Sequence, residues 1–119
     1  MYKSKVVSGN KLGREIGFPT INVSLESLDL DFEFGVYSCH VVVDNQKRLA
    51  AMHYGPKKTI DNIVSLEFHI LDYNDFNYKF EFLEFEVLKF IRPLVKFSSL
   101  IELQKQINLD LLKIKSLHG

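Results

Sequence analysis

The chain has 119 residues, in which 15 lysine and arginine side chains are balanced by 15 aspartate and glutamate side chains. A chain of this length forms one domain with a substantial core, so we expect a single domain over residues 1–119. The balanced charge disfavours surfaces for nucleic acid or for an acidic membrane. Cys39 is the only cysteine, which excludes an internal disulfide and a cysteine-based metal site. No signal sequence or membrane-spanning apolar run is visible, and we therefore expect a cytoplasmic protein.

The first informative segment is glycine-rich and runs from residue 9 to residue 22, with three glycines at a spacing of four residues. Glycine has no side chain to hold a ligand away from the backbone, so such a loop can point several N–H groups at one anion. Two cations lie among the glycines. The candidate phosphate-binding residues are Gly9, Lys11, Gly13, Arg14, Gly17, Thr20 and Asn22. On composition alone, a surface loop whose glycines only make turns is an equal alternative.

Thr20 and Asn22 form a second candidate site at the end of this loop. Pro19 disfavours a helix, so the segment that follows is predicted to be a short strand. On a strand, residues two apart point to the same face. Two neutral oxygens placed in this way suit Mg²⁺ together with phosphate oxygens and water. The alternatives are a β-branched strand former at Thr20 and a turn-type hydrogen bond at Asn22.

The middle of the chain is predicted to be a series of strands. Residues 35–43 are rich in strand-forming side chains, and residues 44–47 are a plausible turn into a second strand over 48–54. In 79–90 the large apolar residues occupy even positions and then odd ones, namely Phe80, Phe82, Phe85 and Val87. This switch predicts a bulge near residues 83–84, as the bend of a small barrel requires.

Residues 63–71 alternate clearly between two faces. Leu66, Phe68 and Ile70 share one face, while Ser65, Glu67 and His69 share the other. Strands are depleted in glutamate, so Glu67 calls for an explanation. On the residues alone the favoured explanation is a solvated strand face, as for most carboxylates.

The last element is predicted to be a helix over residues 98–116. Ser99 and Glu102 have the spacing of a capping box. An apolar stripe with a period of 3.6 residues follows, formed by Leu100, Leu103, Ile107, Leu111 and Ile114. Strands over residues 1–97 with one terminal helix indicate a mainly β protein, a closed antiparallel barrel on which that helix packs, because closure removes exposed strand edges.

Five stretches together resemble the riboflavin kinase family, including the kinase module of bacterial bifunctional FAD synthetases. They are Gly-Arg-x-Ile-Gly-Phe-Pro-Thr-x-Asn at 13–22, Gly-Val-Tyr at 35–37, Tyr-Gly-Pro at 54–56, Leu-Glu-Phe-His-Ile-Leu-Asp at 66–72, and Ile-Arg-Pro followed by Lys-Phe at 91–97. The resemblance covers essentially the whole chain. It departs from the family at Lys58, which replaces a proline, and at Ser4, where glycine is common.

The resemblance implies a Greek-key barrel of about six strands with a terminal helix, and a Mg²⁺-dependent transfer of the γ-phosphate of ATP to the 5′-hydroxyl of riboflavin, giving FMN. It implies that Glu67 is the general base and that Thr20 and Asn22 hold Mg²⁺ and the nucleotide phosphates. It places Arg92 near the flavin, although a strand-end salt bridge is the alternative for that side chain.

The expected partners are riboflavin or FMN and ATP or ADP, without nucleic acid or membrane. We expect either a monomer or one module of a bifunctional FAD synthetase. A module of the same fold that binds flavin or FMN without turnover is the alternative function, kept open by the altered loop at Lys57 and Lys58. A barrel that binds single-stranded nucleic acid is disfavoured by the balanced charge.

Overall fold

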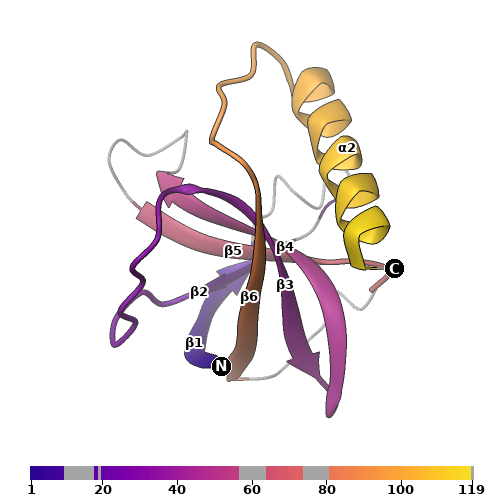
Figure 1. Ribbon diagram of the computed structural model, residues 1–119. Coiled ribbons are helices and arrows are strands. Elements are labelled where there is room, and N and C mark those ends of the chain that lie inside the picture. The colour runs from indigo at the N-terminus through magenta and orange to yellow at the C-terminus, as the bar shows by residue number, and fades with distance from the viewer. Residues whose placement is uncertain (10–17, 19, 57–63, 74–80, 119) are drawn as a thin grey trace.

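The chain folds into a barrel of six antiparallel strands with one helix on its outer surface (Figure 1). The structure is a computed structural model that describes residues 1–9, 18, 20–56, 64–73 and 81–118. The strands are β1 (Tyr2–Gly9), β2 (Ile21–Val23), β3 (Gly35–Val43), β4 (Gln46–Pro56), β5 (Val64–Ile70) and β6 (Phe82–Arg92), and the helix is α2 (Leu100–His118). The expected fold class is confirmed.

The strands close in the order β1-β2-β5-β4-β3-β6. Strands β3, β4 and β5 follow one another as neighbours, and β2 lies beside β5, which is a Greek-key arrangement. Each strand therefore has two partners, and closure leaves no free edge. Within the described part of the chain, no helix is long and apolar enough to span a membrane.

The barrel interior holds the main core. The alternation expected for β5 is confirmed, because Leu66 and Phe68 are fully buried and Ile70 is nearly so. Phe68 meets Phe85 of β6 across the interior with ring centroids 4.7 Å apart. Residues of the opposite parity on each strand consequently lie on the outer face of the barrel.

The β3–β4 hairpin has a tighter turn than expected. Asp44 and Asn45 have φ angles of 53° and 62°, and Val43 pairs with Gln46. Two central residues with positive φ are what a type I′ turn requires, and its twist matches that of the flanking strands. The turn is therefore two residues long, and β4 begins at Gln46 and not at residue 48.

The bulge predicted near residues 83–84 is wrong. Leu83 and Glu84 pair in regular register with β1. The pairing of β6 with β3 shifts further along, where Leu88 and then Ile91 are the extra residues. The prediction failed because Phe82 is 49% exposed and lies on the outer face, so its even position does not mark the core face of β6.

Gly55, near the end of β4, lies against the segment that follows β6. Its φ is 151°, and a Cβ added there would lie 2.3 Å from Cδ1 of Leu94. The segment after β6 therefore passes directly against the end of β4. The positive φ favours glycine at this position, and a larger residue would also require the Leu94 side chain to move.

Helix α2 begins with a modified capping box. The Ser99 hydroxyl accepts a hydrogen bond from the Glu102 backbone N–H at 3.2 Å, as expected for a capping serine. The Glu102 carboxylate accepts hydrogen bonds from the hydroxyl and backbone N–H of Ser98, at 2.7 and 3.3 Å. These bonds hold the pKa of Glu102 below its usual value. The helix then runs to residue 118, two residues beyond the expected end.

One face of α2 packs on the outside of the barrel (Figure 1). Ile114 is fully buried in a second apolar cluster with Val36, Leu71 and Ile91. The expected stripe is thus confirmed at its C-terminal end, whereas Leu100 at the start of the helix is 50% exposed. Side chains on the opposite face, among them Ile101, Leu109 and Leu112, are exposed.

Candidate functional site

Strand pairing places Asn22 directly beside Glu67. Asn22 of β2 is the register partner of Glu67 of β5, and Glu67 is in turn the partner of His53 of β4. All three alternate with core residues, so they lie in one row on the outer face. Directly opposed residues in antiparallel strands have Cβ atoms about 5 Å apart. An amide and a carboxylate from distant parts of the sequence are therefore neighbours.

Asn22 is buried even though it lies on the outer face. Its flanking residues, Ile21 and Val23, belong to the barrel core, and this directs Asn22 outward. Its exposure is nevertheless only 4%. Asn22 Oδ1 and Thr20 Oγ1 are both buried and lack a hydrogen-bond partner among the described residues. A buried polar atom without a partner is unfavourable by about 1–3 kcal/mol, so a ligand that contacted these two oxygens would remove this cost.

The donor set at this point suits a hard cation. Two neutral oxygens, next to a carboxylate, are ligands of the kind that Mg²⁺ uses together with phosphate oxygens and water. Transition-metal sites are instead built from clusters of His, Cys, Asp or Glu side chains. No group of three or more His, Cys, Asp or Glu side chains that could hold a metal ion occurs in the ranges that the structure describes.

The segment before Asn22 also contacts β5. The rings of Phe18 and His69 meet edge to face, with centroids 5.5 Å apart. His69 is two residues from Glu67 and shares its face of the strand. Phe18 and Asn22 thus both lie beside β5, and Thr20 lies between them in the sequence.

The glycine-rich segment is anchored beside the same site at its start. Gly9 pairs with Ile21, and Ser8 pairs with Asn22. The segment therefore leaves β1 next to the position at which the chain enters β2. The other candidate phosphate-binding residues of the loop lie outside the described residues, namely Lys11, Gly13, Arg14 and Gly17, as do Lys57 and Lys58 of the altered loop.

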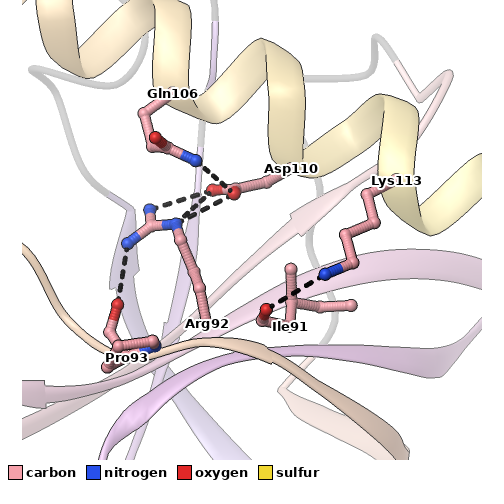
Figure 2. A network of polar contacts seen from close by, with 6 residues as sticks. All are labelled: Ile91, Arg92, Pro93, Gln106, Asp110 and Lys113. Atoms are coloured by element: carbon pink, nitrogen blue, oxygen red, sulfur yellow. Dashed lines mark hydrogen bonds and ion pairs between the residues drawn. The ribbon is translucent and has the colours of Figure 1, made fainter.

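Arg92 is held by helix α2 (Figure 2). Its Nε donates to both carboxylate oxygens of Asp110, at 2.9 and 3.1 Å, and its Nη2 donates to Oδ2 at 2.9 Å. Its Nη1 donates to the Pro93 carbonyl at 3.1 Å. The guanidinium also lies over the Phe97 ring, 5.8 Å from the centroid. The salt bridge weighed as an alternative for Arg92 is therefore present, and its flavin role stays a prediction.

The structure does not bring Arg92 into direct contact with the Asn22–Glu67 pair. Arg92 pairs with Val36, and Val36 pairs with His53. Val36 is only 4% exposed because it packs in the cluster that contains Ile114. Helix α2 therefore covers the outer face between the two positions.

Two residues near these positions were missed by the reasoning from sequence. His53 neighbours Glu67 only through the β4–β5 register, for which the sequence carries no local signal. Asp110 had a signal, because it is a charged residue on the helical face that carries Ile107, Leu111 and Ile114. A buried charge in such a stripe needs a partner from the barrel, and Arg92 is that partner.

Comparison with known proteins identifies the family and the fold. The family model described as Flavokinase, riboflavin kinase, matches residues 1–118. The chain is 37% identical over 108 residues to the RNA-binding riboflavin kinase RibR of Bacillus subtilis, covering 89% of this chain and 46% of that protein. It is 34% identical over 110 residues to the bifunctional riboflavin kinase/FMN adenylyltransferase of Listeria monocytogenes, covering 91% of this chain and 35% of the relative.

A solved structure shares the fold. It is that of a protein named as a macrolide-efflux protein from Streptococcus pneumoniae, with a TM-score of 0.81 and 32% sequence identity. The alignment covers 95% of this chain and 37% of the solved one. The chain thus spans less than half the length of each of these three proteins. On the match of the family model to residues 1–118, the chain belongs to the riboflavin kinase family.

Proposed function

We propose that this chain transfers the γ-phosphate of ATP to the 5′-hydroxyl of riboflavin, giving FMN and ADP. The observation that carries the proposal is the pairing of Asn22 with Glu67, together with the buried, unpartnered oxygens of Thr20 and Asn22. A phosphate-holding group and a proton acceptor must lie side by side for this reaction. Family membership supports the same reaction.

Glu67 is the general base of the proposed reaction. Its carboxylate accepts the proton of the riboflavin 5′-hydroxyl as the bond from that oxygen to the γ-phosphorus forms. The bond from the γ-phosphorus to the oxygen of the β-phosphate breaks at the same time, and ADP leaves with that electron pair. The position of Glu67 on a paired strand supports this role, because both neighbouring strands restrict the backbone that carries the carboxylate.

Thr20 and Asn22 would hold Mg²⁺ through Oγ1 and Oδ1. When bound, the ion would supply positive charge that offsets the charge of the transferring phosphoryl group. Asn22 fixes the nucleotide end of the site beside Glu67, so the donor phosphate and the acceptor hydroxyl meet between β2 and β5. The glycine-rich loop, with Gly9 at its anchored end and Lys11, Gly13, Arg14 and Gly17 beyond it, is proposed to bind the ATP phosphates.

The flavin ring is proposed to bind on the side of Arg92.

Two extensions of the proposal concern the whole molecule. Residues 1–119 are proposed to be one kinase domain, either free-standing or one module of a larger flavin enzyme. Its proposed partners are riboflavin, FMN, ATP and ADP in the cytoplasm.

The test is direct. The purified chain is incubated with riboflavin, ATP and Mg²⁺. The products FMN and ADP are then quantified by chromatography. Matched control reactions contain EDTA or lack ATP. We expect equal amounts of FMN and ADP that require both Mg²⁺ and ATP. Riboflavin binding without any FMN would refute the kinase and favour the non-catalytic flavin module, and absence of both would refute the two proposals together.

A further inference from the structure

The contact between β6 and α2 contains a buried charge that the proposed reaction does not use. Asp110 is the only charged residue among the buried residues of the described ranges, and its side chain is 6% exposed. It receives three hydrogen bonds from Arg92. A fourth comes from the Gln106 side-chain amide, which donates to Oδ1 at 2.9 Å (Figure 2).

Stability alone is a weak reason for such an arrangement. Removing two charges from water is costly, and an apolar pair of similar size often stabilises a protein as well or better. The surroundings offer that option, because Ile91 and Ile114 pack between the same strand and the same helix. A buried and doubly supported ion pair does, however, restrict one guanidinium to one orientation.

The ion pair also changes what Arg92 can recognise. Asp110 offsets its positive charge, and the described contacts use Nε–H, one N–H of Nη1 and one N–H of Nη2. A guanidinium has five N–H donors, so one on each Nη remains beyond these contacts. A charge-compensated donor pair of this kind suits a neutral acceptor such as a ring carbonyl better than a phosphate.

We infer that Asp110 is a positioning residue. It orients the Arg92 guanidinium so that its remaining N–H groups donate to a neutral carbonyl of the isoalloxazine ring, and Gln106 holds Asp110 in turn. The inference rests on the proposed function and deepens it by assigning part of the flavin half of the site to helix α2. Asp110 acts through Arg92 and does not itself touch either substrate. Its loss therefore affects flavin binding and leaves nucleotide binding unchanged.

The experiment measures kcat and both KM values for Asp110→Asn, Gln106→Ala and Arg92→Ala, with thermal unfolding of each variant. Asp110→Asn keeps the shape and removes the charge. It should raise the KM for riboflavin about 10- to 100-fold, the range for a lost hydrogen bond to a charged group. The KM for ATP should change less than about twofold, because Thr20 and Asn22, at the nucleotide end of the site, lie outside the part of the barrel surface on which α2 packs. Gln106→Ala, a milder change, should shift only the riboflavin KM, by a smaller factor.

The matched control is Asp72→Asn, which breaks an exposed ion pair of α2, from Lys115 Nζ to Asp72 Oδ1 at 3.2 Å. Both side chains of that pair are largely exposed, and all kinetic constants should stay at parental values. The double variant Asp110→Asn with Arg92→Ala should bind riboflavin no worse than Arg92→Ala alone. An unchanged riboflavin KM in Asp110→Asn and Gln106→Ala, or equal rises in both KM values, overturns the inference.

The two proposals fail in distinguishable ways. If the parent forms no FMN, the proposed kinase fails. The dissociation constants for riboflavin, measured by flavin fluorescence, then replace the KM values in the same comparison. A parent that is active while these variants lose only thermal stability refutes the positioning role and leaves the kinase intact.

Discussion

Replacing Glu67 by glutamine tests the centre of the proposed site. The change keeps the size of the side chain and its place on the outer face, and it removes the proton acceptor. A positioned general base contributes about 10²- to 10⁴-fold, so kcat should fall by that factor. At about 1.4 kcal/mol for each factor of ten, the activation barrier rises by roughly 3–5 kcal/mol.

The structure predicts that this loss is specific to chemistry. Glu67 alternates with Leu66 and Phe68 of the core and does not belong to it. The free energy of unfolding should therefore change by less than the roughly 2–5 kcal/mol of a core truncation. Riboflavin affinity, measured by fluorescence titration, should stay close to that of the parent, because the base acts on the hydroxyl in the transition state.

Glu84→Gln is the matched control, since Glu84 is an exposed residue of β6 that pairs with β1 and β3 away from the site. Its FMN production should equal that of the parent. Initial rates of FMN formation at saturating ATP and riboflavin provide the comparison. If Glu67→Gln retains a kcat within about threefold of the parent, a loss far below that of a general base, Glu67 is not the base and the reasoning is refuted.

Three further predictions concern the proposed metal site, the core and the helix. Thr20→Val removes an unpartnered buried hydroxyl, so the unliganded protein should be equally or more stable, by up to about 1 kcal/mol. The same variant should bind Mg²⁺–ADP at least about tenfold more weakly; calorimetric affinity equal to the parent's would show that Thr20 is structural. Burial raises the pKa of the Cys39 thiol, so alkylation at pH 8 should be blocked in the folded protein and proceed in urea. Rapid labelling of the folded chain would contradict the core assignment. Ile114→Ala should lower the free energy of unfolding by about 2–5 kcal/mol, whereas Leu112→Ala on the exposed face should change it by less than about 0.5 kcal/mol. Equal urea midpoints for these two variants would show that α2 does not pack through Ile114.

Local patterns were predictable because they depend on residues close together in the chain. The alternation in β5 directs Leu66 and Phe68 inward and leaves Glu67 outside, as the burial confirms. The capping serine of α2 was identified from its spacing to Glu102 alone. Both patterns follow from backbone geometry, in which side chains repeat every two residues on a strand and every 3.6 on a helix.

Register and long-range pairing came only from the tertiary structure. The register shifts in β6 lie at Leu88 and Ile91 because pairing with β3, and not the parity of the phenylalanines, decides where a residue is left over. Arg92 and Asp110 meet because α2 returns over β6 and buries a charge that must be neutralised. The position of the bulge has no local signature strong enough to predict it, and for Arg92 the sequence predicted a salt bridge only as an alternative and without its partner.

The sequence by itself determined the family, the strand-rich chain with one capped helix, and the types of side chain at the candidate site. Only the tertiary structure placed Asn22 beside Glu67 and brought His53 next to them. The physical reason is that the core faces of β2, β5 and β4 must pack together inside a closed barrel. A slip of one residue would turn every core side chain outward, so burial of the core determines which polar residues become neighbours outside it.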